Sequence, residues 1–321
     1  MLRSLTILLL AAIFLLNGCK KDLLHLQSVQ KITSYTDSDR LNKIFFVDQQ
    51  LGFIVGGERF ADAVILTTHD GGYTWQKSSF PVAGKGLYDI TQSPSGAIYT
   101  CGFDGKLLRS YDQGQTWSFS QLEYFPYSGI AFAGPTRAIV VGGVSFSSGM
   151  IQYVDSAGKV TGRDSVTYQY NKIQMANSTT GYICGYGVMI KTTDGAKTWK
   201  YQDVKGDNFT SMDLHGDEIW MCGYNGGIYH TTNGGENWER LRNGNDITLP
   251  RYHLYGIVFK DSQNGWAAGD NGKLIRTDDA GKHWEEYDQF TTNALRSIAL
   301  CPNGDLLVAG DNGTLYRIIP K

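Results

Sequence analysis

The sequence predicts an all-β fold, a seven-bladed β-propeller with four-stranded blades, and three observations lead to this prediction. Glycine makes up 39 of the 321 residues, while only 19% of the residues are charged. Such a composition favours short strands joined by tight turns over charge-rich helices. A turn containing tryptophan and an apolar run ending in glycine both recur along the chain. Their common period of about 42 residues is the usual length of one propeller blade.

The first element is an export signal at residues 1–18. Arg3 precedes an apolar run from Leu5 to Leu16, which is too short to cross a bilayer as a stable helix and is typical of a secretory signal peptide. The run ends in Leu16-Asn17-Gly18-Cys19, which resembles the lipobox of bacterial lipoproteins. We therefore predict cleavage before Cys19 and lipidation of Cys19. An ordinary signal peptide followed by an incidental cysteine is the alternative.

Residues 19–25 are predicted to form the acylated N-terminus and a short tether. Several acyl chains on Cys19 would anchor the protein firmly in a membrane, since each buried methylene contributes about 0.8 kcal/mol. Lys20 follows the cysteine, and by resemblance to lipoprotein sorting rules this residue indicates the outer membrane. The prediction is an exported bacterial lipoprotein on the periplasmic or cell-surface side of the outer membrane.

Residues 26–321 are predicted to form a single propeller that is closed by its own N-terminal strand. The seventh repeat stops after its third strand, Thr314 to Ile319, and lacks an outer strand. The segment from Leu26 to Thr33 precedes the first blade and has no other partner in this scheme. We predict that it pairs with the last blade, because this pairing removes an exposed sheet edge.

The tryptophan turns fit the pattern Ser/Thr-x-Asp/Asn-x-Gly/Ala-x-x-Trp, known as the Asp-box. Five copies occur, and a worn sixth copy runs from Tyr153 to Val160. In such a turn the carboxylate can accept backbone N–H groups while the tryptophan ring covers the turn. Copies spread around a ring cannot converge on one substrate, so we interpret them as structural, and losing one should lower stability and leave function intact. The residues concerned are Asp70, Trp75, Asp112, Trp117, Asp194, Trp199, Asn233, Trp238, Asp279 and Trp284.

The apolar runs give the number of blades. Three cysteines, Cys101, Cys184 and Cys222, directly precede the final glycine of a run. Equivalent positions on different blades lie too far apart for a disulfide, so we interpret these cysteines as buried side chains. In the sixth repeat we expect strands at residues 255–259, 265–268 and 273–276, and a fourth strand from Trp284. The runs end at Gly56, Gly102, Gly142, Gly185, Gly223, Gly269 and Gly310, which makes seven blades.

Charge and residue spacing exclude several kinds of ligand. With 29 basic and 31 acidic residues, the formal net charge is −2. This balance argues against a nucleic-acid partner, because phosphate binding requires a basic surface. No CxxC or HxxxH spacing occurs in the sequence, so we expect no metal site and no cofactor.

The candidate binding face is the end of the channel where the loops after the second and fourth strands of each blade gather. The longest of these loops carries Arg251, Tyr252 and His253, a group able to stack on a ring and hold an anion. Simple turn chemistry is the alternative interpretation of such loop residues. The candidates are Arg251, Tyr252, His253, Tyr255, Arg59, Tyr88, Tyr127, Tyr170, Tyr224 and Arg296.

The segment from Gly265 to Trp284, GWAAGDNGKLIRTDDAGKHW, resembles the repeat of the photosystem II stability and assembly factor family, which are seven-bladed propellers. The resemblance covers residues from about 40 to 318. It implies a non-catalytic scaffold that binds protein partners or ligands on one face. Such repeats also occur in exported proteins of non-photosynthetic bacteria, which the lipobox fits better.

We therefore predict a monomeric, non-catalytic, membrane-anchored scaffold for a protein or glycan partner. Asp-boxes also occur in sialidases and xyloglucan-cleaving enzymes, so the alternative is a glycoside hydrolase acting on surface or dietary glycans. That alternative requires two carboxyl groups about 5–9.5 Å apart at one mouth of the channel, with the pKa of one of them raised.

Overall fold

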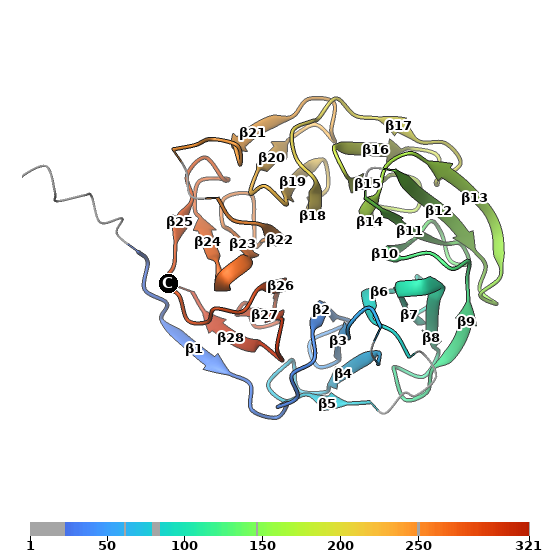
Figure 1. The fold of residues 1–321 in the computed structure, drawn as a ribbon, viewed down its shortest axis with the longest axis horizontal. Coiled ribbons are helices and arrows are strands. Elements are labelled where there is room, and N and C mark those ends of the chain that lie inside the picture. The colour runs from blue at the N-terminus through green and yellow to red at the C-terminus, as the bar shows by residue number, and fades with distance from the viewer. Residues whose placement is uncertain (1–22, 61, 79–83, 146, 249–250, 321) are drawn as a thin grey trace, which may run out of the picture.

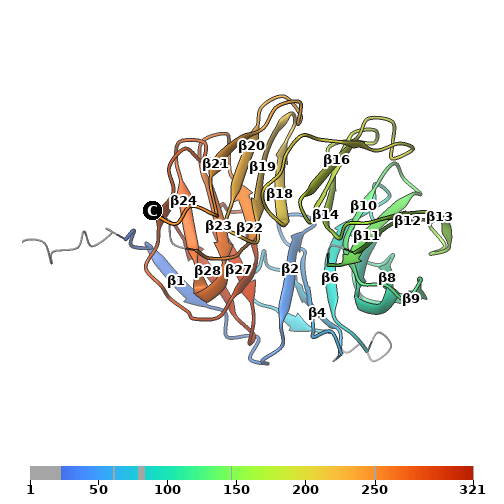
Figure 2. The ribbon, with the colours of Figure 1, turned by 45° about the horizontal axis from the view of Figure 1, so that its top comes forward.

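The computed structural model describes residues 23–60, 62–78, 84–145, 147–248 and 251–320. Seven antiparallel four-stranded sheets surround a central channel, with one strand of each sheet at the channel and one at the rim (Figures 1 and 2). This arrangement confirms the predicted seven-bladed β-propeller. The predicted signal peptide at residues 1–18 and the predicted lipidation site Cys19 lie outside the described residues.

The strands of each blade are called A to D from the channel to the rim. Blade one contains β2 (Leu41–Phe46), β3 (Gly52–Gly56), β4 (Val64–Thr68) and β5 (Gln76–Lys77); blade two β6 (Leu87–Gln92), β7 (Ile98–Gly102), β8 (Lys106–Ser110) and β9 (Ser118–Gln121); blade three β10 (Tyr127–Phe132), β11 (Ala138–Val144), β12 (Ser148–Val154) and β13 (Val160–Val166); blade four β14 (Tyr170–Met175), β15 (Gly181–Gly185), β16 (Val188–Thr192) and β17 (Lys200–Tyr201). Blade five contains β18 (Phe209–His215), β19 (Glu218–Gly223), β20 (Ile228–Thr231) and β21 (Glu239–Arg242); blade six β22 (Leu254–Phe259), β23 (Gly265–Gly269), β24 (Leu274–Thr277) and β25 (Glu285–Glu286); blade seven β26 (Leu295–Leu300), β27 (Leu306–Gly310), β28 (Leu315–Ile319) and β1 (Ser28–Lys31).

Helical structure is confined, in the described ranges, to two short 3₁₀ turns, η1 (Phe103–Gly105) and η2 (Asp270–Gly272). Within these ranges, no helix has the length and apolar character needed to cross a membrane. In blade six the predicted strands differ from the observed ones by one residue at their ends.

Every strand A begins with a β-bulge, which explains the glycine at or near the end of each strand B. In blade one the register shifts between Leu41 and Lys43, and the same shift occurs in the other six blades. A Cβ atom on Gly56 would lie 2.0 Å from the carbonyl oxygen of Arg40, closer than any side chain tolerates. The equivalent glycines meet a backbone carbonyl in five other blades, and Gly223 meets the side chain of Asp207.

The core consists of seven clusters of buried side chains, one at each junction between neighbouring blades. Strand B lies between two junctions, so both of its faces are covered. Phe53, Ile54 and Val55 of β3 are all fully buried. A strand buried on both faces has a continuous apolar sequence instead of an alternating one, and this is why the apolar runs reveal the repeat.

The N-terminal strand closes the ring, as the sequence predicts. β1 pairs antiparallel with β28, so that Ser28 lies opposite Ile319 and Lys31 lies opposite Tyr316. In Figure 1, β1 lies along the outer rim beside β28. Ile32, just beyond the strand, joins the buried cluster between blades seven and one.

Contact with the ring begins earlier in the chain than the closing strand. Leu24 forms a parallel bridge with Tyr287 at the rim of blade six, and its N–H donates to the carbonyl of Glu286 at 2.8 Å. The last residues of the predicted tether are therefore held against blade six.

Candidate binding site at one mouth of the channel

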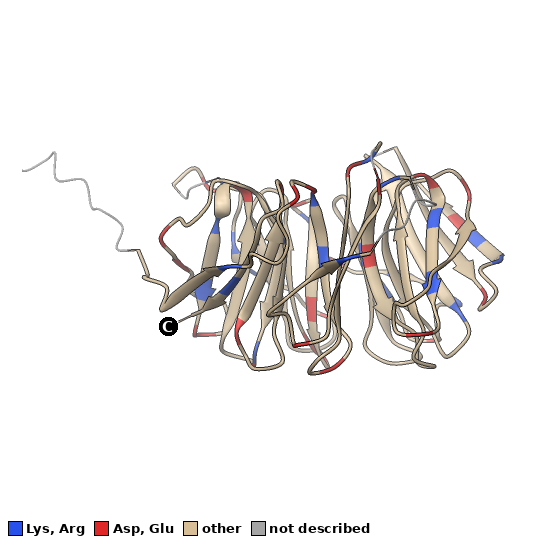
Figure 3. Ribbon diagram, turned by 90° about the horizontal axis from the view of Figure 1, so that it is seen from below, with Lys and Arg blue, Asp and Glu red and all other residues tan. Residues whose placement is uncertain are grey.

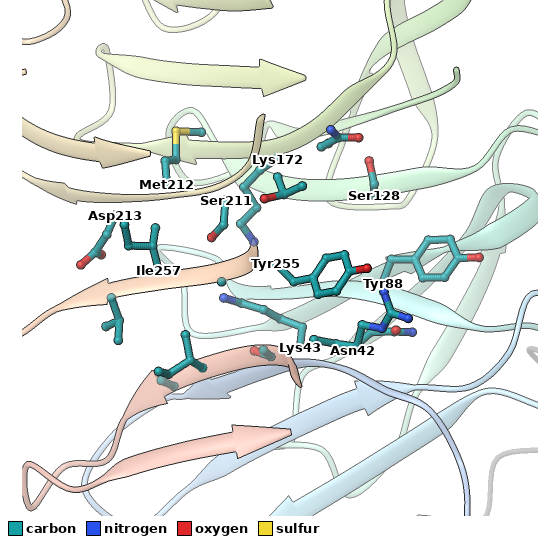
Figure 4. A pocket seen from close by; sticks show the side chains of 18 of the residues that line it. Asn42, Lys43, Tyr88, Ser128, Lys172, Ser211, Met212, Asp213, Tyr255 and Ile257 are labelled. Atoms are coloured by element: carbon teal, nitrogen blue, oxygen red, sulfur yellow. The ribbon is translucent and has the colours of Figure 1, made fainter. Parts of the chain in front are cut away.

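The inner strands enclose a cavity of about 760 Å³ that opens on the face where the B–C and D–A loops lie. We call this opening the loop mouth. Its lining includes strand A residues from all seven blades, and five of the predicted candidates contribute to it: Arg59, Tyr88, Tyr224, Tyr255 and Arg296. Figure 4 shows Tyr88 and Tyr255 at this cavity, with Asn42 beside them.

The second residue of strand A follows a simple rule in four blades. Its polar side chain donates a hydrogen bond to the first carbonyl of the next strand A around the ring. The bonds run from Asn42 to Leu87 at 2.8 Å, from Ser128 to Tyr170 at 2.7 Å, from Asn171 to Phe209 at 2.7 Å and from Thr210 to Leu254 at 2.8 Å. These side chains are thus engaged in joining neighbouring blades.

Blades two, six and seven break this rule, because Tyr88, Tyr255 and Arg296 occupy the position instead. The Arg296 guanidinium donates to both oxygens of Asp311, at 2.9 and 2.7 Å, a paired geometry that fixes its orientation. The same guanidinium lies 4.3 Å from the centre of the Tyr255 ring. Arg40 adds a second cation, with Nε 3.6 Å from Asp311.

Aromatic side chains from blades five and six stand beside this arginine. The rings of Tyr224 and His253 stack with their centres 3.6 Å apart, and His253 Nδ1 lies 2.6 Å from Asp270. Burial raises the pKa of the Tyr255 hydroxyl well above its usual range, and a hydrogen bond with Asp270 raises it further. Tyr255 therefore remains neutral, and its hydroxyl is engaged with Asp270.

A second aromatic group lies at the edge of the loop mouth on blades one and two. The Arg59 guanidinium is 5.1 Å from the centre of the Phe103 ring, and Phe60 packs edge-on against Phe103 at 5.3 Å. Phe60 is nevertheless 78% exposed. Burial raises the pKa of Tyr88, although a hydrogen bond with Arg59 opposes this effect.

The loop group Arg251, Tyr252 and His253 does not line the cavity at the loop mouth. All three line a separate cavity of about 260 Å³ between the loops of blades five and six. The guanidinium of Arg242 lies 4.4 Å from the centre of the Tyr252 ring, whereas His253 stacks on Tyr224. The structure thus divides the predicted residues between two neighbouring cavities.

Tyr127 and Tyr170 were expected at this face, and the structure corrects that prediction. Both are buried, with exposures of 0% and 1%. Each is the first residue of its strand A, a position that leucine or phenylalanine fills in the other blades and that points into a blade junction. The Tyr127 hydroxyl contacts the Met150 sulfur at 3.4 Å and does not reach the cavity.

The Asp-box residues lie in the C–D turns, on the opposite face of the ring from the loop mouth. In all five boxes the Ser or Thr hydroxyl donates to the Asp or Asn side chain at 2.7–2.9 Å. The same side chain accepts the backbone N–H four residues later at 2.9–3.0 Å. The residues so engaged are Asp70, Asp112, Asp194, Asn233 and Asp279.

The box tryptophans differ in what their ring N–H contacts. Trp75 and Trp284 donate to carbonyls inside their own turns, at 3.2 and 2.9 Å. Trp199 donates to the Tyr153 hydroxyl at 3.2 Å. In Trp117 and Trp238 the ring nitrogen is buried without a hydrogen-bond partner among the described residues.

Four cysteines, Cys101, Cys184, Cys222 and Cys301, are free and buried. Burial raises the pKa of all four thiols, to about 12 for Cys222 and about 11 for Cys301. The interpretation of the three repeated cysteines as buried side chains is confirmed. Within the described ranges, no group of three or more His, Cys, Asp or Glu side chains is placed to hold a metal ion.

Several charged residues at the channel were not predicted from the sequence. Arg40, Asp270 and Asp311 orient side chains at the loop mouth, and Lys43 and Lys172 line the channel further inside. Both lysines occupy the third position of strand A, so an alignment of the inner strands was the signal that could have identified them. Figure 3 shows cationic and anionic residues interspersed around the ring, with neither sign gathered on one side.

Comparisons with known proteins agree with this fold. The family described as Photosynthesis system II assembly factor YCF48 matches residues 164–251. A curated relative, the Photosystem II assembly lipoprotein Ycf48 of Synechococcus sp. (strain CC9902), is 36% identical over 67 residues, which is 19% of this chain and 20% of that protein. The match thus spans about a fifth of the relative's length.

Two solved structures of YCF48 share the fold of the whole ring. YCF48 from Cyanidioschyzon merolae has a TM-score of 0.71 at 19% identity and covers 91% of this chain and 98% of its own. YCF48 bound to D1 peptide has a TM-score of 0.71 at 17% identity, with coverages of 95% and 100%. Virginiamycin B lyase from Staphylococcus aureus, at 13% identity, reaches a TM-score of 0.73 over 91% of this chain and 98% of its own, so fold alone does not separate binding from catalysis. The chain is a seven-bladed β-propeller, and its residues 164–251 are similar to the photosystem II assembly factor family.

Proposed function

We propose that this chain is a non-catalytic, exported scaffold that binds an extended segment of a protein partner at the loop mouth. The observation that carries the proposal is the break in the strand A rule: Tyr88, Tyr255 and Arg296 replace side chains that elsewhere join neighbouring blades. The similarity to the structure of YCF48 bound to D1 peptide supports a peptide as the ligand.

The loop mouth offers the contacts that an extended peptide requires. Tyr224 and Tyr255 present aromatic faces, and Arg296 presents a guanidinium whose direction is already fixed by Asp311. Aromatic and arginine side chains are the residues that most often dominate binding energy at protein interfaces. Tyr255 and Arg296 lie on strand A and Tyr224 is stacked on His253. Because these side chains are already held in place, little conformational entropy is lost on binding.

The carboxylates of the described residues favour binding over glycoside hydrolysis. A catalytic general acid requires a carboxyl group with a raised pKa that faces the substrate. Among the described carboxyls, burial raises the pKa of Asp207, but this side chain accepts backbone N–H groups from Asn208, Asn225 and Gly227 at 2.7–2.9 Å. Asp270 and Asp311 at the loop mouth are engaged with His253 and Arg296.

We further propose that Cys19 anchors the protein to the outer membrane. The name of the relative, an assembly lipoprotein, supports an exported lipoprotein. Leu24 is bound at the rim of blade six. Only the four residues from Lys20 to Leu23 separate it from Cys19. The ring would thus be held by its rim, which leaves the loop mouth open to a partner.

The test is selection of peptides on a chain that begins at Leu23. Wild-type protein should select peptides from a displayed random library, and Arg59→Ala and Arg296→Ala should each weaken their binding about tenfold or more. Tyr111→Ala is the matched control, because Tyr111 is 64% exposed but lies in the Asp-box of blade two on the opposite face. Isothermal titration measures the affinities, and circular dichroism verifies that each variant is folded.

The peptide proposal fails if wild-type protein selects no peptides, or if the loop-mouth variants bind the selected peptides as tightly as wild type. A glycan array on the same proteins provides the second arm. Glycan binding that depends on Arg296 and Tyr255, in the absence of peptide binding, would assign the loop mouth to a glycan instead.

A further inference from the structure

Two cavities of the channel share part of their lining. Besides the cavity at the loop mouth, a second cavity of about 590 Å³ opens on the opposite face. Four residues line both cavities: Lys43, Lys172, Gln174 and Asp213. We call this level the waist, and it holds two amines of like charge.

One of these amines belongs to a buried ion pair. Lys172 Nζ lies 2.6 Å from Asp89 Oδ1, and the two side chains are 11% and 2% exposed. The pair reaches from blade four to blade two, passing blade three, where Gly129 occupies the equivalent position of strand A and supplies no side chain. The other oxygen of Asp89 accepts the N–H of Ile130 at 3.0 Å, so each oxygen of this carboxylate already has one partner.

The other amine, on Lys43, makes no hydrogen bond or ion pair with any residue that the structure describes. Figure 4 shows Lys43 and Lys172 extending into the cavity from opposite sides, with Ser211 next to Lys172. The positive charge of Lys172, together with burial, lowers the pKa of Lys43 to about 8, while Asp89 and Asp213 oppose that shift. The waist therefore contains a repulsion between two ammonium groups that no described side chain fully offsets.

Asp213 does not neutralise Lys43 in the way that Asp89 neutralises Lys172. Its Oδ2 accepts the N–H of Phe259 at 2.6 Å and lies 3.3 Å from His215 Nε2. Both carboxylates of the waist are thus directed to other partners. An anion between the two amines would receive charge-assisted hydrogen bonds from each of them and would relieve their repulsion.

We propose that the waist binds a small anion, a carboxylate or an inorganic oxyanion, between the amines of Lys43 and Lys172. Ser211 adds a hydroxyl at the same level of the cavity. The anion site differs from the peptide site in position and in chemistry. The anion proposal therefore does not depend on whether the loop mouth binds a peptide. The cavity is wide enough for the anion to be free or to be one group of a larger acid that enters from the loop mouth.

The experiment is isothermal titration of the chain from Leu23 with sodium sulfate and, separately, with sodium glutarate at constant ionic strength. Lys43→Met should weaken the binding of the preferred anion about tenfold or more, and Lys43→Arg should retain most of it, because arginine keeps the charge. Lys200→Met is the matched control, since Lys200 is an exposed lysine on outer strand β17. Tighter binding of sulfate indicates an inorganic oxyanion, and tighter binding of glutarate indicates a carboxylate ligand.

The pH dependence provides a second readout, because sulfate and glutarate keep their charge between pH 6.5 and 9. Binding requires the protonated amine, and the free amine loses its proton near pH 8. Affinity should therefore be about tenfold lower at pH 9 than at pH 6.5. The proposal is overturned if neither anion binds wild-type protein, if folded Lys43→Met binds as well as wild type, or if affinity does not change with pH.

Discussion

Asp70 shows how a single Asp-box side chain organises its turn. Its Oδ1 accepts the Thr68 hydroxyl at 2.7 Å and the N–H groups of Tyr73 and Thr74 at 2.9 Å, and its Oδ2 accepts the Thr74 hydroxyl at 2.6 Å. Partial burial favours the neutral carboxyl, but these hydrogen bonds outweigh it and lower the pKa of Asp70 to about 2. The side chain therefore stabilises the fold in its ionised form.

Replacing Asp70 with alanine should lower the free energy of unfolding at pH 7 by about 1–3 kcal/mol, since several turn hydrogen bonds are lost. The melting temperature should fall by about 2–8 °C. The folded-state pKa lies below the unfolded one, so this stabilisation is complete above about pH 4 and is lost as pH falls towards 2. Thermal unfolding is followed by circular dichroism at pH 7 and at successively lower pH. The difference in melting temperature between wild type and Asp70→Ala should become smaller as the pH falls.

Asp203→Ala is the control for this prediction, because the Asp203 side chain is 92% exposed and lies 3.4 Å from Lys205. Such a surface change should alter stability by less than about 0.5 kcal/mol. Equal melting temperatures for wild type and Asp70→Ala at pH 7 would show that the box carboxylate is not structural.

The tyrosines at the ends of the inner strands show where sequence reasoning about the site succeeded and where it failed. Tyr88 and Tyr255 are the second residues of their strands and line the cavity, whereas Tyr127 and Tyr170 are first residues and are buried. All four follow a loop and look alike in the sequence. The difference arises from the β-bulge, which turns adjacent side chains in different directions, and a bulge has no clear signature in one strand alone.

At the scale of elements, the inner three strands of a blade had predictable lengths, whereas only the presence of the outer strand, and not its length, was predictable. Strand B is buried on both faces, so packing restricts it to small and apolar residues in every blade. Outer strands face solvent on one side, and their lengths range from two residues in β5, β17 and β25 to seven in β13. The ion pair between Lys172 and Asp89 was also unpredictable, because it joins residues of two blades that are not neighbours.

β1 is the element on which closure of the ring depends. Deleting residues 24–33 removes the partner of β28, the bridge to blade six and the buried side chain of Ile32, which is 4% exposed. We expect the melting temperature to fall by at least about 5 °C, since burial of Ile32 alone is worth about 1.5–3 kcal/mol. The measurement is thermal unfolding compared with a chain that begins at Leu23.

Both proteins in this comparison lack the signal peptide, so they differ in the closing segment alone. The exposed edge of β28 should also make the shortened protein associate, which light scattering would detect. A shortened protein that melts at the same temperature as its control would contradict a closing role for β1.

At the scale of the whole molecule, the proposed anchoring depends on one residue, Cys19. Mass spectrometry of the mature protein should find Cys19 as the first residue with acyl chains attached. Cys19→Ala should remain an uncleaved precursor or leave the detergent phase, because several acyl chains are needed for stable membrane attachment. A mature N-terminus at another residue, or an unmodified Cys19, would refute the lipoprotein prediction.

The pairing of β1 with β28 also has a mechanical consequence. Ser28 lies opposite Ile319 and Lys31 opposite Tyr316, so the start of β1 and the end of β28 are at the same end of the seam. A force that pulls the N-terminal extension and the C-terminus apart therefore breaks the hydrogen bonds between β1 and β28 one after another and not all at once. The junctions between neighbouring blades are crossed by continuous backbone, and the one from blade seven to blade one is crossed by the segment that joins β1 to β2. Tension on the chain ends would thus open the ring at the blade-seven seam while the remaining blades stay assembled.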